Sequence, residues 1–307
     1  MFAFLVRRLL SAIPTLFLIV AMSFFMMRVA PGGPFDGQRK LPPDIERNMK
    51  AAYDLDKPVY VQFYKYLTKV LHGDFGPSFK SKDFTVSQLI LVGAPISIRI
   101  GLTALAIAII VGLGLGTFAA LRQNTAADFL TMGIAMFGIT IPTFVVAPIF
   151  ILVFAVLLRW LPAGDWNDGD LRHVILPITT LALPQIAVVA RLSRGSMLEV
   201  LRSNFVRTAR AKGLSSFKVM TRHVMRAGLL PLVSYLGPAA AALMTGSLVI
   251  ERIYGLPGIG RYFVEGAINR DYTVVMGVII VYAVLILALN LVADLAYGWL
   301  DPKVRYD

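Results

Sequence analysis

The chain has 307 residues, of which 57% are hydrophobic, and its mean hydropathy is +0.71. A soluble globule of this composition would expose much of its apolar surface to water, so we expect lipid to surround most of the chain. The net charge is +12, and the lack of cysteine excludes disulfides, iron–sulfur clusters and thiol catalysis.

Six apolar runs are long enough to cross a membrane, because about 20 helical residues span roughly 30 Å of hydrocarbon. The sequence therefore predicts an all-α membrane protein of six transmembrane helices, at residues 9–30, 98–121, 131–158, 174–192, 229–250 and 274–297. The first run is longer than a signal-peptide core and no small-residue cleavage site follows it, so we expect it to be retained as an anchor. Kinked, packed helices are expected in the third and fourth runs, which contain Pro142, Pro148, Pro177 and Pro184.

Lys and Arg are distributed unevenly between the two sides of these spans. One side carries fourteen of them, and the short loops of the other side carry five. Because cytoplasmic loops carry the excess of positive charge, both termini are predicted to be cytoplasmic. The first side holds Arg7, Arg8, Arg122, Lys303, Arg305 and nine residues between 191 and 226, and the second holds Arg159, Arg172, Arg252, Arg261 and Arg270.

The segment 31–93 then lies on the extracytoplasmic side, and it is too long to be a simple connector. A proline pair followed by Asp44 is typical of a helix start, and apolar residues recur at helical spacing from Val59 to Val70. We expect a small helical cap. It is either a lid that packs on the helix ends or a docking surface for a delivery protein.

Several residues within or near the spans have two interpretations, one functional and one purely structural. Arg99, near the outer end of the second run, either extends to the interface or contributes to a transport pathway. Asp294, in the sixth run, is interpreted as a structural partner of Arg191 or Arg194 rather than a proton relay. The G-x-G-x-G run at 112–116 lies inside a span with no strand before it, so it indicates close helix packing rather than a nucleotide site.

The outer end of the fifth run is followed by a turn rich in Gly and Pro. Glu251, Tyr254 and Pro257 there are either contacts of the transport pathway or parts of a tight turn that needs such residues for its geometry. The three histidines, at positions 72, 173 and 223, lack the spacing of metal ligands, so no metal site is expected.

The cytoplasmic loop 193–226 is strongly basic and contains helix signals. Between residues 191 and 226 the only acid is Glu199, which leaves a local charge of +8. Ser203 or Asn204 can cap a short helix that a left-handed Gly213 ends, and the serines at 215 and 216 can cap the next helix. A basic loop of this kind can be a solvated face or can bind anionic lipid or nucleic acid, but the paired helix signals predict a rigid protrusion at the membrane surface.

The stretch Arg207-Thr208-Ala209-Arg210-Ala211-Lys212-Gly213 resembles the E-A-A-x-x-x-G loop of bacterial ABC import permeases. Arg207 stands where the glutamate is usual, and Thr208 replaces the first alanine. Both departures match the peptide-importer branch, whose loop is similar to R-T-A-R-A-K-G. Three further stretches agree in order: Arg7 to Gly32 resembles that branch's first helix, residues 72–78 resemble its G-D-x-G-x-S loop, and residues 246–260 resemble its segment after the fifth helix. The likeness is nearest to the B-type permeases of oligopeptide importers.

This resemblance implies a type I ABC importer permease fold in a bacterial inner membrane. It divides the chain into a first helix (1–30), an extracytoplasmic loop with short helices (31–93) and a core of five transmembrane helices (94–307). It also implies three kinds of protein partner: a second homologous permease, two ATPase subunits or domains, and an external peptide-binding protein. No nucleic-acid partner is implied.

The sequence has no G-x-x-x-x-G-K-[ST] loop, so we expect no ATP site or enzymatic activity of its own, with ATP and Mg²⁺ bound by the ATPase partners. By the same resemblance, residues 207–213 dock in a groove of the ATPase, where Ala209 and Ala211 permit close approach. The resemblance implies a permease subunit that moves peptides into the cytoplasm, with oligopeptides as the expected cargo. Dipeptides, nickel complexes and other small solutes are the alternative cargoes for the same machinery. A stand-alone secondary transporter is the rival, although no internal repeat supports it.

Overall fold

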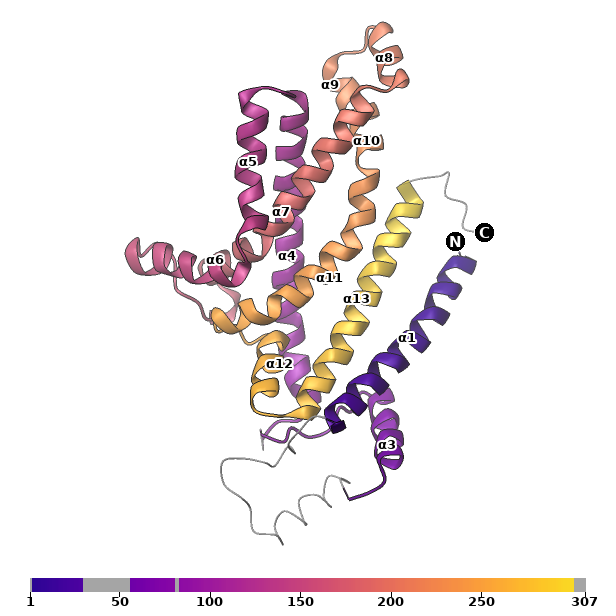
Figure 1. The fold of residues 1–307 in the computed structure, drawn as a ribbon, viewed down its shortest axis with the longest axis vertical. Helices are drawn as coiled ribbons and strands as arrows, with labels where there is room; N and C mark the ends of the chain where they lie inside the picture. Colours follow the sequence, from indigo (N-terminus) through magenta and orange to yellow (C-terminus); the bar gives the residue numbers. More distant parts are fainter. Residues whose placement is uncertain (1, 30–55, 81–82, 301–307) are drawn as a thin grey trace. The chain divides into compact units, whose positions relative to one another are not determined.

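The computed structural model describes residues 2–29, 56–80 and 83–300, and these residues are almost entirely helical (Figure 1). The helices are α1 (Phe2–Val29), α3 (Val59–Leu71), α4 (Val86–Leu121), α5 (Ala126–Thr140), α6 (Thr143–Phe150), the π-helix η1 (Ile151–Leu157), the short 3₁₀-helix η2 (Asn167–Gly169), α7 (Leu171–Leu201), α8 (Asn204–Ala211), α9 (Ser216–Val219), the π-helix η3 (Met220–Val224), α10 (Met225–Gly228), α11 (Leu230–Ile253), α12 (Ile259–Ile268) and α13 (Tyr272–Leu300). The predicted helix start near Asp44 lies outside the described residues.

Five helices are long and apolar enough to cross a membrane, and a bent pair provides a sixth candidate span. The five lie in α1, α4, α7, α11 and α13, as predicted, although α4 begins twelve residues before the predicted run, which places Arg99 well inside the helix. The predicted run 131–158 corresponds to the bent pair, in which α5 and the segment after it meet at an angle of 101°, so the kink expected there is a sharp break between two helices. Pro142 explains the bend, since the residue before a proline is disfavoured in the α region, and Ile141 is extended with φ −102° and ψ 123°.

The helix α7 behaves differently, because it passes through Pro177 and Pro184 as one 31-residue helix. Of its most apolar window, 61% is buried inside the chain, so neighbouring helices pack around both prolines. The packing expected around these two prolines is therefore observed, and the helix continues through both of them.

The described chain forms two compact units. One unit contains residues 1–97 and 257–285, and the other contains residues 98–256 and 286–307. They are described separately below as the first and second unit.

In the first unit, α1 packs on α3, which confirms the helix predicted from Val59 onward. Phe24 of α1 is buried, with its ring centre 5.3 Å from that of Phe63 and 5.8 Å from that of Tyr66, both on α3. Aromatic rings at these separations contribute more than their buried area alone.

The G-D-x-G-x-S loop ends beside one carboxylate, that of the residue just before α13. Asp271 accepts a hydrogen bond from the Ser78 hydroxyl at 2.5 Å and from the backbone amides of Phe79 and Lys80 at 3.2 Å. Its carboxylate also stands at the helix N-terminus, where negative charge is favourable. Ser78 of the motif therefore attaches the loop to α13, a long-range role that the sequence did not predict.

In the second unit, α4 and α7 approach closely at the glycine run. A Cβ added to Gly112 would lie 2.7 Å from the Cβ of Val189, and one added to Gly116 would lie 2.4 Å from the carbonyl oxygen of Ala190. A Cβ on Gly114 would meet nothing within 4 Å. Two of the three glycines are thus required by close helix packing, as predicted.

Candidate functional site

The segment 204–228 forms a protrusion of short helices at the end of α7, within the second unit (Figure 1). The helix α8 is followed by Gly213, whose φ of +75° confirms the predicted left-handed position. The amide of Gly213 donates to the carbonyl oxygen of Arg210, and the amide of Leu214 donates to that of Ala209. These bonds satisfy carbonyl groups that the last turn of the helix would otherwise leave unpaired.

The capping of the two short helices differs from the prediction at one position. Ser203 occupies the N-cap of α8, but its hydroxyl donates to the carbonyl oxygen of Val200 at 2.6 Å instead of accepting from α8. Ser215 caps α9 as predicted, by accepting from the amide of Lys218 at 3.4 Å. The Ser203 hydroxyl therefore binds the end of α7 instead of α8, because the Val200 carbonyl lies only three residues back along the chain.

A small apolar core holds α8 against the rest of the second unit. Val206 and Ala209 of α8 are buried. They belong to one cluster with Ala120, Met197, Val219 and Val224, which come from α4, α7, α9 and η3. Ala209 was expected to permit close approach of a partner, but it faces the interior of the chain, whereas Ala211 is exposed as expected. The helical period explains this, since Val206 and Ala209 are three residues apart and share one face.

The outer face of this protrusion combines positive charge with exposed aromatic rings. Arg207, Thr208, Arg210 and Lys212 are all exposed. Phe205 and Phe217 are 49% and 77% exposed. We call the exposed side chains of residues 205–217 the basic–aromatic face. Such a surface is typical of a contact site for another protein.

Two polar contacts attach the base of this protrusion to neighbouring helices. The Ser196 hydroxyl of α7 donates to the carbonyl oxygen of Gly228 in α10. Arg194 of α7 makes a two-pronged ion pair with Asp128 of α5, with N–O distances of 2.6 and 2.7 Å. Asp128 is 1% exposed and also accepts from the amide of Asn124. Arg194 was suggested as a partner of Asp294, but the ion pair that the structure shows for it is with Asp128.

The residues suggested for the outer mouth are placed as follows. Glu251 and Tyr254 are both buried, and the Tyr254 hydroxyl lies 2.9 Å from that of Thr180 in α7. The Tyr254 carbonyl oxygen accepts from the amide of Asp165 at 2.7 Å. Burial raises the pKa of the Tyr254 hydroxyl, which therefore stays protonated. These contacts attach the residue after α11 to α7 and to the loop at Asp165.

The two remaining residues of this set are Arg99 and Pro257. Arg99 is exposed, and its guanidinium lies over the ring of Trp166 at 5.6 Å, a cation–π contact within the second unit. Pro257 is half-buried and belongs to the first unit. The sequence pattern suggested Arg99 because it is a charge in an apolar run, but it could not identify Trp166 as its neighbour.

Two family models match the chain. The model described as "Binding-protein-dependent transport system inner membrane component" matches residues 112–306, and a model for the N-terminal part of such membrane components matches residues 1–89. The first match covers the whole basic–aromatic face together with α5, α7, α11 and α13.

Known relatives extend over the full length. The chain is 52% identical over 306 residues to the oligopeptide transport system permease protein OppB of Salmonella typhimurium, with 100% of both chains covered. It is 41% identical to the dipeptide transport system permease protein DppB of Bacillus subtilis, over 98% of this chain and 97% of that one.

Solved structures show the same fold at low identity. The MetNI methionine ABC transporter in inward-facing conformations matches with a TM-score of 0.60 and 16% identity, covering 70% of this chain and 97% of the other. An amino acid ABC transporter matches with a TM-score of 0.54 and 14% identity, covering 69% and 94%.

Proposed function

Because the chain belongs to the family of binding-protein-dependent transport system inner membrane components, we propose that it is a permease subunit of an ABC importer that carries oligopeptides into the cytoplasm. The observation that supports this cargo most directly is the likeness to oligopeptide permeases at about half identity over the full chain. The dipeptide permeases among the relatives favour dipeptides as the second candidate.

The energy for transport comes from ATPase partners that contact the basic–aromatic face. The position supports this, since the face contains the loop that resembles the coupling loop of import permeases, and the charge asymmetry predicts that it is cytoplasmic. Its chemistry fits a protein partner, because exposed Phe205 and Phe217 supply apolar area and the surrounding Arg and Lys residues supply orientation.

The remaining partners follow from the same assignment. A second homologous permease completes the membrane pathway, two ATPase subunits or domains bind and hydrolyse ATP with Mg²⁺, and an extracytoplasmic binding protein delivers the peptide. This chain itself is not an enzyme. Glu251, Tyr254 and Pro257 support the outer end of α11 and the turn after it, and Arg99 is the exposed candidate for a pathway contact.

The experiment is reconstitution of the purified complex in proteoliposomes with its binding protein. ATP-dependent uptake of labelled peptides of two to six residues is measured. Uptake of peptides longer than two residues supports the proposal, and uptake of dipeptides alone favours the second candidate. Uptake that this chain performs alone, driven by an ion gradient and independent of ATP, would instead identify a secondary transporter.

A further inference from the structure

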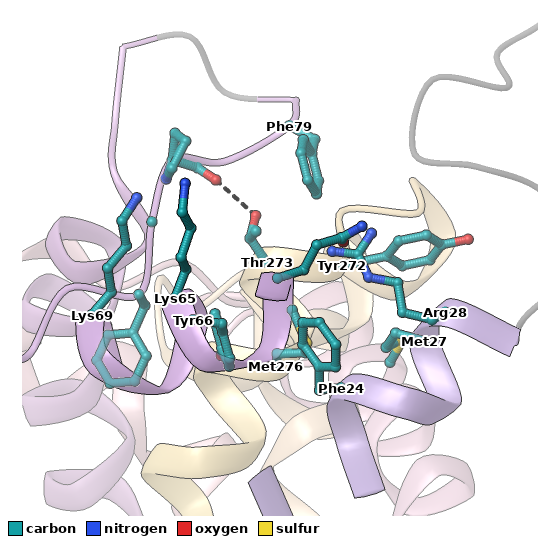
Figure 2. Close-up of a pocket in the computed structure, with 14 residues that line it drawn as sticks. Phe24, Met27, Arg28, Lys65, Tyr66, Lys69, Phe79, Tyr272, Thr273 and Met276 are labelled. Carbon is teal, nitrogen blue, oxygen red and sulfur yellow. Dashed lines mark hydrogen bonds between the residues drawn. The ribbon is translucent and has the colours of Figure 1, made fainter. Parts of the chain in front are cut away.

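The first unit contains a pocket that the transport assignment does not use (Figure 2). Its volume is about 160 Å³, roughly ten times what a single water needs, so it can hold a multi-atom group. It is lined by fourteen residues from α1, α3, the loop 75–79 and the start of α13. Three of them, Arg28, Lys65 and Lys69, are basic, and none of the fourteen is acidic.

The basic side chains approach the pocket from two different helices. Figure 2 shows Lys65 and Lys69 extending from α3 on one side and Arg28 reaching in from α1 on the other. The Arg28 guanidinium also lies 5.0 Å above the centre of the Phe24 ring, which holds it at the pocket edge. Asp271, which precedes α13, is not a lining residue, and its carboxylate accepts from Ser78 and the loop amides.

The inner wall is aromatic and contains one polar atom that lacks a partner. Phe24, Tyr66 and Met276 lie together on this wall (Figure 2). The Tyr66 hydroxyl is buried and has no hydrogen-bond partner among the described residues. Burial also raises the pKa of this hydroxyl, so it stays a donor at neutral pH. A buried donor without a partner is costly, and an anionic oxygen in the pocket would satisfy it.

The position along the chain places this pocket at the membrane–water interface. Arg28 is one residue from the end of the span in α1, and Tyr272 is the first residue of the span in α13. Beside the pocket, α1 presents exposed apolar side chains at Met22, Phe25 and Met26. A ligand with an anionic head at the depth of Arg28 and apolar chains along α1 would match both surfaces.

We propose that this pocket binds the phosphate of an anionic phospholipid, with Arg28, Lys65 and Lys69 around the head group and the acyl chains along α1. The arrangement depends on the membrane assignment of α1 and α13 and not on the cargo of the importer. The lipid would hold α1, α3 and the start of α13 together as one interfacial assembly.

The test uses the full chain with the subunits that copurify with it, in nanodiscs of phosphatidylcholine with increasing phosphatidylglycerol. Native mass spectrometry counts the phosphatidylglycerol molecules retained per chain. Each of K65Q and K69Q should weaken retention about fivefold, on the basis of about 1 kcal/mol for each basic residue near an anionic lipid. The matched control is K80Q, which removes an exposed Lys of the same unit that does not line the pocket and should retain lipid as wild type does.

A second arm separates the lipid from a free anion. Inorganic phosphate at millimolar concentration should compete only weakly, because it lacks the acyl chains. The proposal is overturned if K65Q and K69Q retain phosphatidylglycerol as wild type does, or if inorganic phosphate displaces it fully. It is also overturned if these variants lose a protein subunit while their lipid retention is unchanged, since the pocket would then be a protein contact.

Discussion

Replacing Gly213 tests whether the left-handed end of α8 is needed for ATPase coupling. A side chain at φ +75° costs about 1–2 kcal/mol, because its Cβ approaches the following carbonyl oxygen. Nothing lies within 4 Å of a Cβ built there, so the cost of Gly213→Ala comes from the backbone and not from a clash. A cost of this size shifts the population of the correctly ended helix by about 5- to 30-fold.

The matched control is Gly195→Ala in α7, which also meets nothing within 4 Å but lies in regular helix. There the same substitution should be neutral or stabilising by about 0.5–1 kcal/mol. Gly213→Ala should still insert in the membrane, yet retain fewer ATPase subunits on purification and show less ATP-dependent uptake per molecule. Gly213→Val should be more severe, because a β-branched residue is disfavoured further in this region. Full uptake by Gly213→Val at normal protein levels would refute the coupling role of α8.

The remaining predictions concern the core beneath the protrusion, the ion pair and the topology. Ala209→Glu should lower the free energy of unfolding of the chain itself by about 3 kcal/mol, because it buries a carboxylate in the apolar cluster. Ala211→Glu should fold normally and weaken only the binding of ATPase subunits. Equal stabilities of the two variants would contradict the observed packing. Asp128→Asn should cost about 2–4 kcal/mol in thermal unfolding, because a buried charge pair loses one partner, and an unchanged melting temperature would argue against it. In the cysteine-free chain, Asp83→Cys and Ser215→Cys should react with an impermeant thiol reagent from opposite sides of the membrane, and labelling of both from outside would overturn the predicted orientation.

Features that depend on local chemistry were predictable from the sequence. Five spans follow from apolar length, α3 follows from the helical spacing after Val59, and the left-handed Gly213 follows from its place after a short amphipathic helix. In each of these, the deciding interaction lies within a few residues along the chain. The prediction of close packing also succeeded at Gly112 and Gly116, although not at Gly114.

Features that depend on distant residues were not predictable. Ser78 and Asp271 are 193 positions apart, and no local sequence pattern predicts their hydrogen bond. The partner of Arg194 is likewise on another helix, and the sequence suggested Asp294 for it instead of Asp128. The angle of 101° after α5 arises from Pro142, but a proline inside an apolar run is equally compatible with an unbroken helix, as Pro177 and Pro184 of α7 demonstrate.

The contacts beneath the basic–aromatic face determine how a displacement of α8 would spread. Val206 and Ala209 anchor α8 in a core that includes Met197 of α7, so α8 cannot shift alone without opening that core. One turn earlier, Arg194 binds the buried Asp128 of α5, and separating these charges would cost several kcal/mol. In the coupling proposed above, ATPase closure acts on a few exposed side chains of the basic–aromatic face. Moving α5, α7 and α8 together then costs less free energy than breaking either contact. The ends of these three helices beside the basic–aromatic face are therefore expected to move as one body, with the sharp bend at Ile141–Pro142 as the place where α5 can move independently of the segment that follows it.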